Sequence, residues 1–137
     1  MERRFILARN IVIAISVVLS SVSSCFFTMI GASAGLGEMG LFPVIKIPVY
    51  VWVIWGIAWG AACGYFIGKL LIKALLKRRN ALFGFLYGLL GALVIGSVNG
   101  FLTGTLIFGV IIGAFLGPGG GLILAAIFLL IYKPQQT

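Results

Sequence analysis

The sequence predicts an all-α integral membrane protein, a four-helix transmembrane bundle that forms a single transmembrane domain over residues 1–137. Of the residues, 62% are hydrophobic and only 9% are charged, which leaves too little polar surface for a soluble domain of this size. The apolar residues also gather in four long runs. Each run reaches the roughly 20 residues that cross about 30 Å of hydrocarbon as a helix. We expect helices at about residues 11–34, 47–76, 81–102 and 106–132.

The first run has two readings. Arg3 and Arg4 precede an apolar stretch, as in a cleavable signal, and residues 22–25 (Val-Ser-Ser-Cys) resemble a bacterial lipoprotein cleavage box. Apolar sequence nevertheless continues beyond Cys25, where a mature lipoprotein usually has a polar tether. We therefore expect an uncut transmembrane helix.

The turn between the third and fourth runs also has two candidate positions. Asn99-Gly100 is a turn signal, and so is the Thr-Gly-Thr sequence at residues 103–105. The first would leave a short third helix and a very long fourth one. The second gives balanced spans, and we prefer it.

A glycine-rich segment interrupts the fourth run near its middle. Proline lacks an N–H and clashes with the preceding turn, and glycine gives little helical support. We therefore predict a broken fourth helix. The break is either a packing kink or a candidate mid-membrane site, in which freed backbone groups face a cavity or substrate, as in transporters. The segment comprises Gly117, Pro118, Gly119, Gly120 and Gly121.

Small residues recur at every fourth position in all four runs, which places them along one face of each helix. In lipid, such a strip lets helix backbones approach closely, and van der Waals contact then holds them together. The strips either close the bundle of one chain or join subunits. The predicted packing positions are Ser16, Ser20, Ser24, Thr28 and Ala32; Gly56, Gly60, Gly64 and Gly68; Gly84, Gly88, Ala92, Gly96 and Gly100; and Gly109, Gly113, Gly117, Gly121 and Ala125.

Basic residues lie on one side of the predicted bundle. The net charge is +8, and of the ten Lys and Arg residues only Lys46 falls between the first and second runs. The positive-inside rule then places both termini in the cytoplasm of a bacterial or archaeal inner (cell) membrane. We expect lipid contact rather than nucleic-acid binding. The predicted contacts with anionic lipid are Arg3, Arg4, Lys73, Lys77, Arg78 and Arg79.

The apolar runs carry few groups suited to catalysis. The chain has no His, and both acids, Glu2 and Glu38, lie outside the runs. Cys25 and Cys63 lie within runs, where we expect them to pack as small hydrophobic residues. We therefore expect no enzyme activity, no metal and no cofactor.

Three functions remain open on the sequence. The first is a non-catalytic small subunit or assembly protein of a larger membrane complex, which packs against other transmembrane helices through its glycine stripes. The second is a small channel or transporter, built as a homo-oligomer, with the Gly117–Gly121 segment at its pathway. The third is a holin-like or toxin-like pore former.

Overall fold

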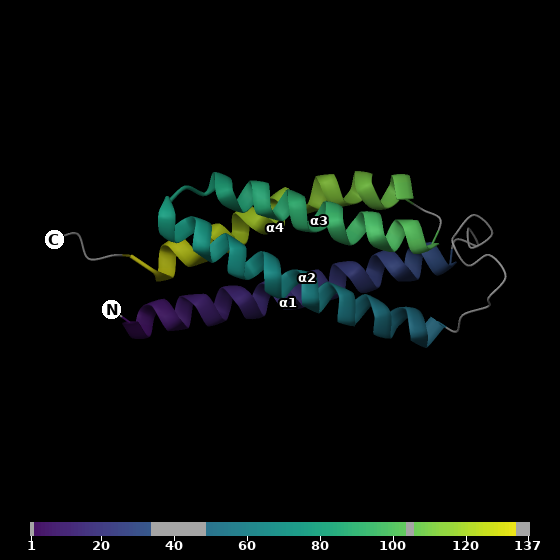
Figure 1. Ribbon diagram of the computed structural model, residues 1–137, viewed down its shortest axis with the longest axis horizontal. Helices are drawn as coiled ribbons and strands as arrows, with labels where there is room; N and C mark the ends of the chain where they lie inside the picture. Colours follow the sequence, from purple (N-terminus) through teal and green to yellow (C-terminus); the bar gives the residue numbers. More distant parts are fainter. Residues whose placement is uncertain (1, 34–48, 104–105, 134–137) are drawn as a thin grey trace.

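The computed structural model describes residues 2–33, 49–103 and 106–133, and all regular structure in these ranges is helical (Figure 1). Each helix is long and apolar enough to cross a membrane. The predicted all-α class, with four helices of transmembrane length and composition among the described residues, is therefore confirmed. The helices are α1 (Glu2–Ser33), α2 (Val49–Lys77), α3 (Leu82–Thr103) and α4 (Leu106–Ile131).

The helix bounds differ from the expected ones chiefly at the start of the chain. α1 begins at Glu2 instead of near residue 11, so the segment that carries Arg3 and Arg4 is helical and its side chains are exposed. α3 continues through Asn99 and Gly100 to Thr103, which fits the later of the two candidate turns. That turn itself, at residues 104–105, lies outside the described residues, as does the segment with Glu38 and Lys46.

The predicted break in the fourth helix is not present. α4 is helical from Leu106 to Ile131, with Pro118 inside it. A proline removes only one backbone hydrogen bond, and hydrocarbon offers the neighbouring backbone groups no partner outside the helix. Close packing of Gly117 and Gly121 on α3 also supports the chain on both sides of Pro118. The glycine-rich segment is therefore accommodated as helix.

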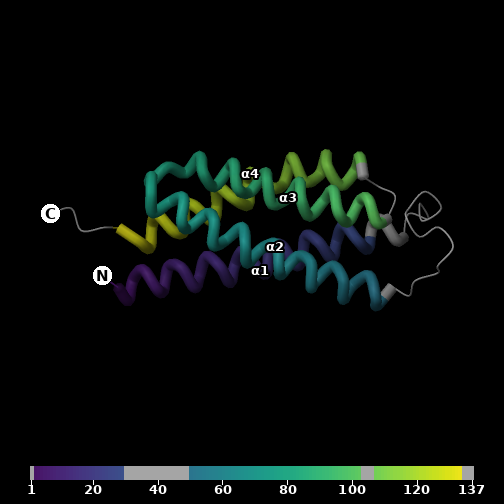
Figure 2. The backbone as a smooth tube through the Cα atoms, viewed as in Figure 1, coloured from purple at the N-terminus to yellow at the C-terminus, as the bar shows by residue number. Residues whose placement is uncertain are grey.

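The bundle consists of two helical hairpins. α1 packs most closely on α2, and α3 packs most closely on α4. In Figures 1 and 2, α1 and α2 cross near their middles, and the start of α1 and the end of α4 lie at the same end as the connection between α2 and α3. This end carries the described basic residues, so we call it the basic end. The residues are Arg3, Arg4, Arg9, Lys69, Lys73, Lys77, Arg78, Arg79 and Lys133.

An apolar core joins the two hairpins at the basic end. Side chains from α1, α2 and α4 are buried together there, and Phe83 and Tyr87 of α3 pack against them. The ring of Tyr132 lies 5.5 Å from that of Phe5, between their centroids, and so links the two ends of the chain. The core residues are Ala8, Val12, Leu71, Ile72, Leu75, Leu124, Ala125 and Phe128.

Candidate functional site

The glycines of α2 lie against the serine-bearing face of α1. A Cβ added to Gly56 would lie 2.8 Å from the Cα of Cys25, and one added to Gly60 would lie 2.6 Å from the Cα of Ser21. Both distances are shorter than an ordinary van der Waals contact. The two backbones therefore approach so closely that only glycine fits at these positions. Gly64 and Gly68 continue the contact along Ser16.

A side-chain hydrogen bond reinforces the α1–α2 contact. The buried Ser16 hydroxyl donates to the carbonyl oxygen of Gly64 at 2.7 Å. Such bonds between membrane helices contribute about 0.6 kcal/mol each. Absence of a Cβ at Gly64 is what brings its backbone within reach of the serine.

The glycines of α3 and α4 lie against each other over most of the length of the two helices. Cβ atoms added to Gly84, Gly88 or Gly96 would overlap the backbone of α4, and the reverse holds for the opposing glycines. Gly100 is buried near the end of α3. The pairs that oppose each other are Gly84 with Gly121, Gly88 with Gly117, and Gly96 with Gly109, while Gly113 lies on Ala92.

A buried polar junction joins three helices at the end opposite the basic end. The Asn99 amide of α3 donates to the Ser24 hydroxyl of α1 at 2.8 Å, and Nε1 of Trp55 in α2 donates to Oδ1 of Asn99 at 3.2 Å. Asn99 and Ser24 are fully buried. Trp55 also stacks on Trp59, whose own indole N–H is buried and makes no hydrogen bond within the described part of the chain. Sequence reasoning missed this junction, because it considered Asn99 only as part of a candidate turn signal.

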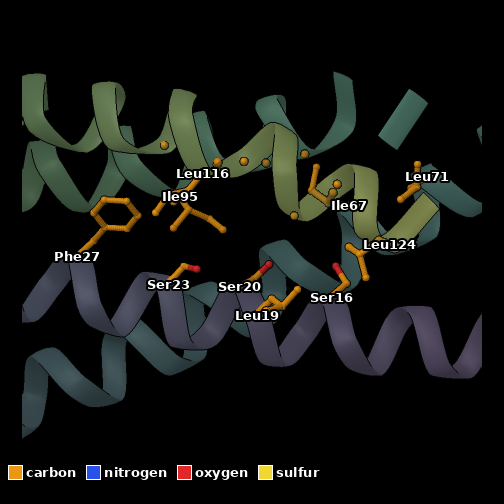
Figure 3. A pocket seen from close by; sticks show the side chains of 17 residues that line it. Ser16, Leu19, Ser20, Ser23, Phe27, Ile67, Leu71, Ile95, Leu116 and Leu124 are labelled. Carbon is orange, nitrogen blue, oxygen red and sulfur yellow. The ribbon is translucent and has the colours of Figure 1, made fainter. Parts of the chain in front are cut away.

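Between the core and this junction lies a cavity of about 100 Å³, bounded by all four helices. Figure 3 shows Ser20 and Ser23 of α1 pointing into it, with Leu116 and Ile95 on the opposite wall. The hydroxyl of Ser16, which also lines the cavity, donates to Gly64 of α2. The lining residues are Ser16, Leu19, Ser20, Ser23, Phe27, Ile67, Leu71, Gly88, Gly91, Ala92, Ile95, Gly113, Leu116, Gly117, Gly120, Gly121 and Leu124.

The cavity brings together part of the predicted site residues. Gly117, Gly120 and Gly121 of the candidate mid-membrane site line it, whereas Pro118 and Gly119 do not. Ser23 and Leu116 contribute to the lining without having been predicted as site residues. The available signal for Ser23 was a further hydroxyl beside the small-residue positions Ser20 and Ser24 of α1. Leu116 gave none, because one leucine in an apolar run looks like any other.

Every charged side chain of the described ranges lies outside this cavity, and its lining is formed by aliphatic, aromatic, glycine and serine residues. The arrangement suits a neutral and largely apolar occupant. In the described part of the chain, no group of three or more His, Cys, Asp or Glu residues could hold a metal ion.

The predicted anionic-lipid contacts are exposed at the basic end. Arg79 also has a structural partner there: its guanidinium donates to the carbonyl oxygen of Tyr132 at 2.8 Å, and it lies over the Tyr132 ring. This contact caps the final turn of α4 with a positive charge, which the helix dipole favours.

No known protein family, curated protein or solved structure matches this chain at a significant level.

Proposed function

We propose that the chain is a non-catalytic subunit or assembly protein of a larger membrane complex, and that it binds a partner transmembrane helix on the outer face of α4. The observation that carries this proposal is the environment of Gly119. It is exposed, and an added Cβ would meet nothing within 4 Å among the described residues. The period-four glycines whose contacts are described above differ from Gly119, because another helix of the same chain already packs against each of them.

In lipid, bare backbone on an exposed helix face allows another membrane helix to pack closely against it. Helices there associate through close van der Waals contact, and small residues allow that approach. Phe115 and Ile123, one turn to either side of Gly119, are 82% and 58% exposed. Large side chains that flank a small one form a notched surface, which an opposing helix can fill more completely than lipid chains can.

The experiment is purification of the tagged full-length chain in a mild detergent. We expect heterologous membrane proteins to co-purify in fixed proportion with the wild type and to be lost from Gly119→Leu. Ile123→Leu, on the same exposed face, is the matched control and should retain them. Equal recovery of partners with both variants would contradict an interface at Gly119, and a chain that purifies alone would contradict the subunit proposal.

A small oligomeric channel or transporter is the second candidate, because the cavity lies at Gly117, Gly120 and Gly121, within the segment predicted as a mid-membrane site. Its apolar lining favours a neutral solute over an ion. Flux of neutral solutes into proteoliposomes of the purified chain tests this function. Flux that Gly120→Leu abolishes would support it, and the absence of flux from a purified homo-oligomer would contradict it.

We further propose that the basic end faces the cytoplasm and contacts anionic lipid. The support is the collection at one end of the described Lys and Arg residues, including exposed Arg3, Arg4, Lys73, Lys77 and Arg78. Basic residues in short loops remain on the cytoplasmic side. Each such residue near an anionic surface contributes about 1 kcal/mol of attraction.

A further inference from the structure

The cavity between the hairpins opens sideways toward the lipid. Leu19 of α1 and Leu116 of α4 both belong to its lining and are also 42% and 61% exposed, so they mark a mouth between α1 and α4. Its lining comes from the middle of each of these helices, as Ser20 and Gly117 show. A molecule within the bilayer can therefore enter without crossing an aqueous phase.

The two walls of the cavity differ in chemistry. The α1 wall carries the hydroxyls of Ser20 and Ser23, which point into the space and make no hydrogen bond within the described part of the chain (Figure 3). The third serine, Ser16, differs because its hydroxyl already donates to Gly64. The opposite wall is largely the backbone of α3 and α4, exposed by glycines such as Gly120.

This combination restricts the occupant. A charged group would have no counter-charge in this lining, and burial of an unpaired charge at this depth is costly. A purely aliphatic chain would leave two hydroxyls without partners in hydrocarbon, which also costs free energy. An oxygen that accepts or donates a hydrogen bond satisfies the hydroxyls, while an attached apolar chain fills the remaining space.

The geometry points to a binding site for a neutral lipid that carries a hydroxyl or carbonyl oxygen at mid-bilayer depth, such as a long-chain secondary alcohol or ketone with its oxygen near the middle of the chain. Ordinary phospholipids hold their oxygens at the interface and would present only chain ends here. A cavity of about 100 Å³ is smaller than the roughly 150 Å³ that accommodates benzene. It therefore holds the polar group and a few carbons, and the rest of the chain extends through the mouth at Leu19 and Leu116.

The chain supplies matched variants for a test. Gly119 and Gly120 are neighbours, and a Cβ at either meets nothing within 4 Å, but only Gly120 lines the cavity. Gly120→Leu should fill the cavity, and Gly119→Leu should leave it open. Ser23→Ala removes a lining hydroxyl, whereas Ser21→Ala removes one that lies outside the lining and approaches the Ile57 carbonyl oxygen at 3.5 Å.

The experiment is photolabelling of the purified chain in phosphatidylcholine nanodiscs with a long-chain secondary alcohol that has its hydroxyl near mid-chain and bears a diazirine. Mass spectrometry locates the adducts, and the unlabelled alcohol and the alkane of equal length serve as competitors. We expect adducts on cavity residues that the alcohol displaces better than the alkane. Ser23→Ala should weaken binding roughly threefold, the equivalent of one hydrogen bond between groups in a membrane.

We expect Gly120→Leu to lose these adducts while Gly119→Leu and Ser21→Ala keep them. Equal labelling of both glycine variants would overturn the site, because it would show general contact with surrounding lipid. Equal competition by alkane and alcohol would overturn the assignment of an oxygen-bearing ligand. Ser23→Ala keeps the test valid if Gly120→Leu fails to fold. No partner protein is needed, so the outcome is independent of the proposed subunit function.

Discussion

The side chain of Asn99 connects α3 to two other helices. Its amide donates to Ser24 of α1, and its carbonyl oxygen accepts from Trp55 of α2, so one residue connects three helices. Hydrogen bonds between membrane helices contribute about 0.6 kcal/mol each and up to about 1.7 kcal/mol. Asn99 is fully buried. Loss of its side chain would also remove the acceptor of the Trp55 N–H.

We predict that Asn99→Ala destabilises the bundle by about 1–2 kcal/mol, since it removes bonds to two helices and opens a small void. Reversible unfolding in mixed micelles of mild detergent and dodecyl sulfate, followed by tryptophan fluorescence, measures this change. Ser97→Ala is the control, because among the described residues the Ser97 hydroxyl bonds within its own helix, to the Val94 carbonyl oxygen. If the two variants unfold at the same detergent fraction, the junction does not hold the helices together.

The position of Asn99 also shows where sequence reasoning fails for single residues. Asn-Gly is a strong turn signal in water, because both residues tolerate left-handed backbone and the amide can bond nearby backbone groups. Within a lipid-embedded run, the backbone must satisfy its own hydrogen bonds, so helix persists. The amide then seeks partners on other helices, and their identity depends on packing that the local sequence does not encode.

At the scale of the helices, the period-four positions were readable from the sequence, but their partners were not. The glycine positions of α2, α3 and α4 offer similar bare backbone, so the sequence alone did not decide which helix α2 would face. In the structure, α2 faces the serine-bearing side of α1, and α3 faces α4. The short connection between α3 and α4 favours such antiparallel neighbours. Connection length does not explain the pairing of α1 with α2, because α2 and α3 are joined by a shorter segment and pack less closely.

The same contacts explain why α4 stays helical where a break was predicted. The low intrinsic helix propensities of Pro118 and its flanking glycines disfavour a helix in this segment. Contacts of Gly117 with Gly88, and of Gly121 with Gly84, hold the segment against α3. Tertiary contact and the lack of backbone partners in lipid therefore outweigh local preference.

Two substitutions in α4 separate close packing from helix propensity. A Cβ at Gly121 would overlap the carbonyl of Gly84 and lie 2.8 Å from the Cα of Gly88, so α3 and α4 would have to separate. We predict that Gly121→Ala destabilises the bundle by about 1–3 kcal/mol. Gly119→Ala meets nothing within 4 Å and should be neutral or stabilising by up to about 1 kcal/mol.

Thermal unfolding in detergent, followed by circular dichroism, measures both changes. The two variants add the same methyl group two residues apart, so each controls for the chemistry of the other. Equal melting temperatures would mean that α3 and α4 tolerate added bulk, and the glycine contact would then contribute little to stability.

At the scale of the whole molecule, the two hairpins are held together at their ends and parted in the middle. The apolar core joins them at the basic end, and the Asn99 junction joins them at the other. The cavity lies between. Composition and run length predicted the four helices, because these depend on local hydrophobicity. The cavity could not be predicted, since it arises where two separately packed hairpins fail to fill the space between them.

The distribution of charge over the whole molecule predicts its orientation in the membrane. Because the described basic residues share one end, we expect that end in the cytoplasm. Single cysteines at Lys77 and Lys133, in a chain with both native cysteines replaced by alanine, should react with a membrane-impermeant maleimide only after the cells are permeabilised. A cysteine at Glu38, between α1 and α2 in the sequence, is the control and should react in intact cells. Reaction of the Lys77→Cys variant in intact cells, with Glu38→Cys protected, would reverse the orientation and move the basic residues away from the anionic cytoplasmic leaflet.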